Sequence, residues 1–194
     1  MTTPLIRRRR AADLDGCVAA LAEVHRVDRY PLNWPADPRR WLCEPRPDHA
    51  WVAVADDAAI VGHVAVHRVA PGPAGASLVR PTAEVARLFV APSARGLALG
   101  GALLDRVHQW ASAHGTDLAL EVTSDGAAAT ALYERTGWRC TGTSTAAWTA
   151  PDGSAVSLRH YTLSGDAVPA IAASRRASRA AASRNSGGST TSTS

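Results

Sequence analysis

The chain contains no lysine, so all 21 of its basic side chains are arginines. Residues 1–166 carry 17 arginines and 17 acidic residues, and the four remaining arginines follow residue 166. The larger part of the chain is therefore nearly neutral. It offers no sustained basic stripe of the kind that attracts a phosphate backbone, and we expect no nucleic-acid partner.

Long apolar runs are also missing. A membrane-spanning helix needs about 18 or more consecutive apolar residues, and no such run occurs. The arginines of residues 7–10 follow a short apolar stretch, whereas a secretory signal places its charges first. We therefore expect a cytoplasmic protein that has no membrane partner.

Metal-ligand patterns are equally scarce. The three cysteines, Cys17, Cys43 and Cys140, lie far apart, and none forms a C-x-x-C pair. His63 and His67 share one face of an expected strand, but no third ligand follows at a recognisable spacing. We therefore expect no metal and no disulfide framework.

The last 30 residues differ from the rest in composition. Residues 165–194 consist mainly of Ala, Ser, Arg, Gly and Thr, and they contain too few large apolar side chains to form a core. We expect one domain over residues 1–164, followed by a disordered tail over residues 165–194.

Apolar periodicity and turn residues divide the domain into alternating strands and helices. The order is β-α-α-β-β-β-α-β-α-β-β, which predicts a mixed α/β sheet with helices on its faces. We expect strands at residues 6–9, 50–55, 59–68, 82–90, 118–123, 138–149 and 156–163. We expect helices from residue 12 or 13 to about 25 and at residues 39–42, 98–114 and 126–136. The histidines of the third helix, His108 and His114, are expected on its surface.

One strand leads through a turn of small residues into a helix. The turn lies around Arg95–Gly101, between the strand at residues 82–90 and the helix at 98–114. Helix N-termini present unpaired N–H groups to anions, and small residues let a phosphate approach the backbone. The segment therefore indicates an anion cradle. It matches neither a Walker loop nor a Rossmann turn, because the required Gly-Lys-Ser/Thr and glycine spacings are absent.

Two motifs give this cradle a family resemblance. Arg95, Ala98 and Gly100 match an Arg-x-x-Gly/Ala-x-Gly/Ala pattern, and downstream the chain reads Ala-x-x-Leu-Tyr-Glu-Arg-x-Gly-Trp over residues 129–138. Together they resemble motif A and the following helix of the GNAT (Gcn5-related N-acetyltransferase) superfamily, and the element order agrees over about residues 4–163. The chain departs from the common pattern with Gly126, where many members have asparagine.

The resemblance implies a GNAT fold of the α/β (α+β) class, with a mixed central sheet of about seven strands and helices on both faces. It implies an acyl-CoA-dependent N-acyltransferase that moves the acetyl group of acetyl-CoA onto a primary amine of a small molecule or a peptide N-terminus by direct attack. A non-catalytic acyl-CoA-binding regulatory module is the alternative. A homodimer is left open as a further partner.

The resemblance also assigns roles to residues. Tyr133 would be the general acid that protonates the leaving thiolate, and Glu84 the base that deprotonates the amine. The alternative for Tyr133 is a core aromatic, and that for Glu84 is an exposed carboxylate near a strand end. The residues implied to bind acetyl-CoA are Leu88, Phe89, Val90, Arg95, Gly96, Leu97, Ala98, Leu99, Gly100 and Gly101.

The residues that would bind the acceptor amine are less clearly indicated than those for acetyl-CoA. Tyr30 and Trp34 fall in the segment that lines the acceptor site in this family, and His63 is a further candidate for contact with the substrate. Aromatic side chains there favour an apolar or aromatic amine, although packing of the loop onto the sheet explains them as well. Residues 23–48 hold five acids and five arginines, which does not indicate a strongly acidic pocket for polycations.

Overall fold

The computed structural model describes residues 4–69 and 82–167. The segment between the strands expected at residues 59–68 and 82–90, and the tail from residue 168, lie largely outside the described residues. Within the described chain, seven strands form one mixed sheet in the order β1-β2-β3-β4-β5-β7-β6. Strands β4 and β5 run parallel, and the other neighbouring pairs are antiparallel.

The elements occur in the predicted order, and their bounds differ from the expected ones mostly by single residues. The strands are β1 (Leu5–Arg8), β2 (His49–Val54), β3 (Ile60–Arg68), β4 (Thr82–Val90), β5 (Asp117–Thr123), β6 (Arg139–Thr149) and β7 (Ala155–Leu163). The helices are α1 (Leu14–Asp28), α2 (Pro38–Trp41), α3 (Leu99–Ala113) and α4 (Ala127–Arg135), with short 3-10 turns at Ala11–Asp13 and Pro92–Ala94. No helix in the described chain is long and apolar enough to cross a membrane.

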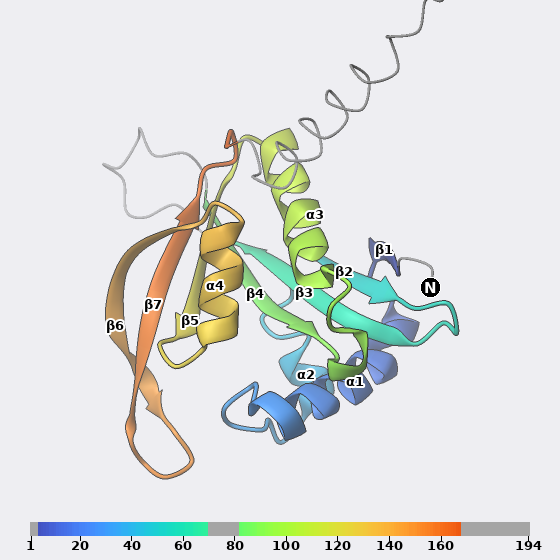
Figure 1. Cartoon of the computed structure of the whole chain (residues 1–194), viewed down its shortest axis with the longest axis horizontal. Helices are drawn as coiled ribbons and strands as arrows, with labels where there is room; N and C mark the ends of the chain where they lie inside the picture. The colour runs from blue at the N-terminus through green and yellow to red at the C-terminus, as the bar shows by residue number, and fades with distance from the viewer. Residues whose placement is uncertain (1–3, 70–81, 168–194) are drawn as a thin grey trace, which may run out of the picture.

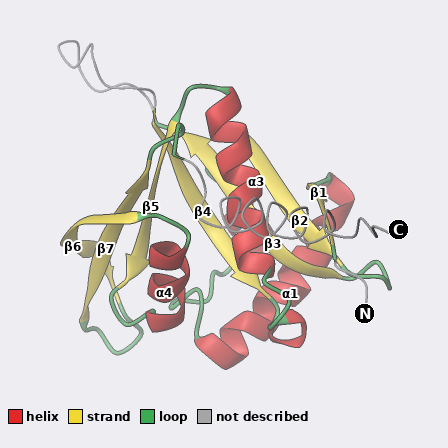
Figure 2. Ribbon diagram, turned by 45° about the horizontal axis from the view of Figure 1, so that its top comes forward, coloured by secondary structure: helices red, strands yellow, loops and turns green. Residues whose placement is uncertain are grey.

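Helices cover both faces of the sheet, as predicted, and each face has its own core (Figures 1 and 2). Helix α1 buries Cys17, Leu21 and Val24, spaced about one turn apart, against one face. Helices α3 and α4 cover the other face, where Leu103 and Tyr133 join the second core. His108 of α3 is buried rather than on the surface, and its Nε2 lies 3.3 Å from the Ser164 carbonyl oxygen.

Glycine allows α1 to lie close to the sheet. A Cβ atom added to Gly16 would lie 2.7 Å from Cγ1 of Ile60, closer than real Cβ atoms approach another carbon. Any larger residue at this position would push the helix away from β3.

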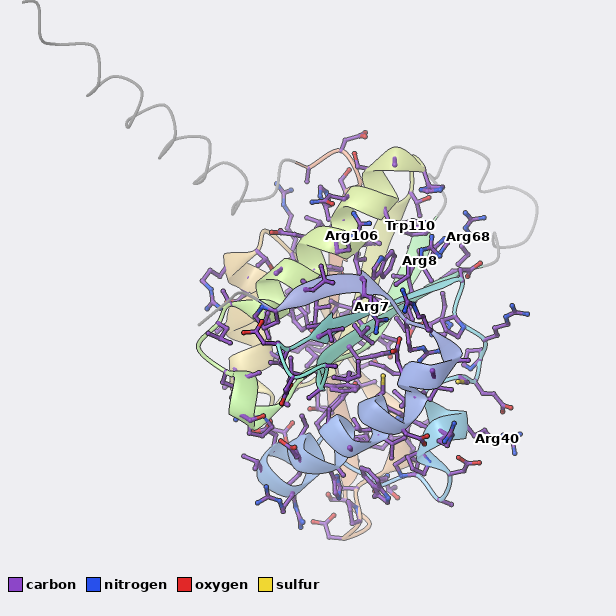
Figure 3. The ribbon with its side chains drawn as sticks, turned by 90° about the vertical axis from the view of Figure 1, so that its right-hand side faces the viewer. Arg7, Arg8, Arg40, Arg68, Arg106 and Trp110 are labelled. Atoms are coloured by element: carbon purple, nitrogen blue, oxygen red, sulfur yellow. The ribbon has the colours of Figure 1, made fainter. Side chains whose placement is uncertain are left out.

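An ion pair joins the first strand to the start of α1. The Arg7 guanidinium donates two hydrogen bonds to the Asp13 carboxylate, at 2.6 and 2.8 Å, and the Arg10 backbone N–H donates a third at 2.6 Å. The hydrogen bond from Arg7 is the main reason that the pKa of Asp13 falls to about 2. On the same side of the molecule, Arg8 and Arg68 lie over the rings of two buried tryptophans (Figure 3).

The sheet opens between its two central strands. Parallel pairing of β4 with β5 covers only residues 82–84 and 117–119, after which the strands diverge (Figure 1). Strand β5 stays paired with β7 over residues 118–123, so β5, β7 and β6 separate from β4 as a unit. The result is a gap in the middle of the sheet, and the candidate site is arranged around it.

Candidate active site

The β4 side of the gap is shaped by a bulge. Ala65 pairs with Ala86 but His63 pairs with Phe89, so Arg87 and Leu88 both stand opposite Val64. Arg87 takes the left-handed conformation with φ 53°, unusual for a residue other than glycine. Leu88, in the bulge, and Val90, beyond it, line the diverging part of β4, and their side chains are half-buried against the core under α3.

The expected anion cradle lies at the end of the same strand. The backbone N–H groups of residues 96–101 find no backbone acceptor among the described residues, and the last of them belong to the first turn of α3. Gly96 and Ala98 have φ values of 80° and 56°, which curl the chain ahead of the helix. An added Cβ at Gly100 would come within 3.0 Å of the Leu132 side chain. The turn therefore holds several N–H groups that have no backbone acceptor in the described chain, and its role as an anion cradle stays a prediction.

The side chains around this turn have other partners. The Arg95 guanidinium forms an ion pair with Asp28 at the end of α1, so it is directed toward that helix. Leu99 is buried in the core under α1, and Phe89 stacks on the His63 ring at 5.3 Å. The cradle therefore consists of backbone groups.

Tyr133 belongs to α4 and lies on the α3 and α4 side of the sheet. Its ring packs against Trp138 and Tyr161, with centroids 5.9 and 5.7 Å away, and only 7% of the residue is exposed. Its hydroxyl bonds no described residue and is not among the buried polar atoms that lack a partner. Burial, and next the nearby Tyr30, raise the pKa of Tyr133. The ring is thus a core aromatic, while the protonated hydroxyl stays accessible.

On the opposite face, Arg87 fixes α2 to the sheet. Its guanidinium donates to the backbone carbonyl oxygens of Trp41 and Glu44, at 2.5 and 2.7 Å. It also lies over the Trp41 ring, 4.7 Å from the centroid, and its Nη1 is 3.4 Å from Nε2 of His67. The positive charge of Arg87 is therefore directed at α2.

His63 is enclosed behind this arrangement, which differs from the expected contact with substrate. The residue is fully buried, its Nδ1–H donates to the Arg87 carbonyl oxygen at 2.9 Å, and Arg9 donates to its Nε2 at 3.0 Å. Burial lowers the pKa of His63 to about 3, so the ring is neutral. His63 supports the bulge from within the core, where no acceptor can reach it.

The segment between α1 and α2 crosses the same face as Arg87. Tyr30 is half-buried against Trp41, with ring centroids 6.3 Å apart, and burial raises its pKa to about 12. Trp34 packs on the His25 ring at 5.0 Å and is 40% exposed. Asn33 donates to the Thr149 carbonyl oxygen at 2.8 Å, which ties the segment to the far end of β6.

Near the point where β4 and β5 separate, this face has a hollow of about 380 Å³. Glu84 of β4 and Glu121 of β5 both line it, and Glu84 is exposed and stands opposite His67 in the β3–β4 pairing. His160 of β7 lines it as well, with Nδ1 3.1 Å from the Glu121 carboxylate and Nε2 2.7 Å from the Ser144 hydroxyl.

The sequence analysis missed Glu121, His160 and Arg87. Glu121 interrupts an apolar run in β5, which was an available signal, whereas His160 lies in a strand with several other polar residues and gave none. The bulge at Arg87 left no signal, because arginine is not a residue that favours a positive φ.

Within residues 4–69 and 82–167, no group of three or more His, Cys, Asp or Glu side chains is arranged to hold a metal ion. His63 and His67 are instead linked through Arg87.

Comparison with known proteins agrees with this arrangement. A family model described as "Acetyltransferase (GNAT) family" matches residues 14–138. No curated protein matches the chain in sequence.

Solved structures share the fold at low sequence identity. An N-acetyltransferase from Staphylococcus aureus Mu50 has a TM-score of 0.68 at 20% identity, covering 85% of this chain and all of the other. Arabidopsis thaliana NAA60, in complex with a bisubstrate analogue, has a TM-score of 0.67 at 20% identity, with 84% and 98% covered. The ribosomal-protein-S18-alanine N-acetyltransferase of Escherichia coli has 0.65 at 18% identity, with 84% and 95% covered.

Proposed function

Since the chain belongs to the acetyltransferase (GNAT) family, we propose that it transfers the acetyl group of acetyl-CoA to a primary amine of a small molecule or a peptide N-terminus. The observation that carries this proposal is the gap between β4 and β5, which has an anion cradle at one end and an open hollow beside it. Acetyl-CoA would supply the activated acyl group, as a thioester.

The residues around the gap fit the donor. The N–H groups of residues 96–101 would bind the pyrophosphate, and the edge of β4 at Leu88 and Val90 would pair with the pantetheine arm much as another strand would. Arg95 would assist only after leaving Asp28, so the backbone is the main phosphate ligand in this proposal.

The two faces of the sheet suit the two halves of the reaction. The amine would approach from the hollow, where Glu84 accepts a proton from it directly or through water. Tyr133 lies on the opposite face, where its hydroxyl would protonate the departing thiolate.

An acceptor screen tests the proposal. Purified protein and acetyl-CoA are incubated with tyramine, putrescine, alaninamide and a heptapeptide that begins with alanine, and released thiol is measured beside the mass of the product. We expect thiol release above hydrolysis with at least one of these amines. Tight binding of acetyl-CoA without any acetylated product would instead favour a non-catalytic acyl-CoA-binding module.

A further inference from the structure

The acceptor hollow carries two acidic side chains from different strands. Glu84 comes from β4 and Glu121 from β5, on either side of the point where these strands separate. An acyl group at the end of the gap would lie beside both. The hollow is therefore charged at the place where an acceptor amine would arrive.

Glu121 contacts a histidine of the neighbouring strand. It stands directly opposite His160 in the β5–β7 pairing, and the imidazole Nδ1 is 3.1 Å from its carboxylate. Nε2 of the same ring lies 2.7 Å from the Ser144 hydroxyl. The three side chains therefore lie next to one another on β5, β7 and β6.

This arrangement contributes little to stability. Glu121 is 54% exposed and His160 30% exposed, and ion pairs at such positions add little to the free energy of folding.

No arginine among the described residues offsets the two carboxylates within the lining. Arg87 donates to two carbonyl oxygens near α2 and is not among the residues that line the hollow. Arg139 stands opposite Thr162 at the start of β6, outside the residues that line the hollow. Besides the carboxylates and the His160 imidazole, the polar side chains in the lining are the hydroxyls of Thr141, Tyr161 and Thr162.

We propose that Glu84 and Glu121 make the site selective for amines that carry no carboxylate next to the amino group. This inference rests on the proposed acetyl transfer. Monoamines, diamines and peptide N-termini are then acceptors, and free α-amino acids are excluded. An ammonium ion is attracted by both glutamates, whereas the α-carboxylate of an amino acid is brought close to two like charges. His160 is a positioning residue that keeps Glu121 directed at the hollow.

Matched acceptor pairs test this selectivity. The ratio of kcat/KM is measured for tyramine against tyrosine, putrescine against ornithine, and alaninamide against alanine. Because two charges near a protein surface interact strongly at contact distance, we expect the parent to favour the member without the carboxylate by about tenfold or more. The ratio should decrease as salt is raised, since ions screen exposed charges.

Single substitutions test which side chains cause the preference between the paired acceptors. Glu121→Gln keeps the shape of the side chain and removes its charge, and it should lower the ratio by about three- to tenfold. His160→Gln should lower the ratio in the same direction by a smaller factor. Glu23→Gln is the matched control, because Glu23 is exposed on α1 outside the lining, and it should leave the ratio and its salt dependence unchanged.

The outcomes separate the two proposals. Equal turnover of the paired acceptors, or a ratio unaffected by both Glu121→Gln and salt, would overturn the selectivity and leave acetyl transfer intact. Absence of thiol release with every amine and amino acid tested, despite acetyl-CoA binding, would overturn the proposed function and this inference with it.

Discussion

Replacing Tyr133 by phenylalanine tests the catalytic assignment most directly. The ring contacts with Trp138 and Tyr161 remain, and the lost hydroxyl bonds no described residue, so stability should change by less than about 0.5 kcal/mol. If the hydroxyl protonates the thiolate, turnover should fall by about 10²–10⁴-fold, which corresponds to about 3–5 kcal/mol of activation free energy. Affinity for acetyl-CoA should stay within about twofold.

The assay combines thiol release, calorimetric binding of acetyl-CoA and urea unfolding on the same preparations. Burial raises the pKa of Tyr133, so the hydroxyl stays protonated at pH 6–9 and parent activity should show no loss on the alkaline side from its ionisation. A variant that turns over at the parent rate, in a reaction whose chemical step is shown to limit kcat by single-turnover kinetics, would reduce Tyr133 to a packing residue.

Three further predictions concern the cradle and the fold. Gly100→Glu should weaken acetyl-CoA binding at least about tenfold in calorimetry, whereas Gly100→Ala, which adds only the Cβ, should weaken it much less. Equal effects of the two variants would mean that no phosphate lies at the turn around Gly100. Asp13→Asn should lower the free energy of unfolding by about 2 kcal/mol at neutral pH, measured with urea. The lowered pKa of Asp13 contributes stability above about pH 4, and this contribution is lost as the pH falls through about 2. A loss of stability that stays constant down to about pH 2 would contradict this. Gly16→Ala should lower stability by about 1 kcal/mol in thermal unfolding despite the better helix propensity of alanine, because its Cβ would overlap Ile60; a stabilised variant would contradict the close approach of α1 to β3.

The strand, turn and helix proposed to bind the donor could be predicted from the sequence because their determinants are local. They follow one another within about 20 residues, and the N–H groups that find no backbone acceptor belong to that same turn. The role of Tyr133 comes from the family resemblance of its helix and stays a prediction. The order of strands and helices followed from periodicity, which depends only on neighbouring residues.

The acceptor side depends on pairing between distant segments, and here the predictions were incomplete. His63 was expected to contact substrate, because alternation along a strand shows which residues share a face but not what covers that face. The His63 ring is enclosed by Arg9, which follows β1, and by the carbonyl oxygen of Arg87, which belongs to β4. Similarly, His108 was placed on a helix surface, although the chain after β7 packs over it.

The acidic character of the hollow shows why local composition misleads at this site. The segment over residues 23–48 is balanced in charge, so it gave no indication of an acidic pocket, and Arg87 adds a positive charge nearby. The structure turns Arg87 toward α2 and brings Glu84 and Glu121 together from strands that pair over only three residues each. Charge in the hollow is therefore a property of the sheet register: the divergence of β4 from β5, proposed to make room for the donor, also leaves these two carboxylates in the lining. A variant that extended the β4–β5 pairing past Glu84 would close the gap and lose donor binding and acceptor selectivity together.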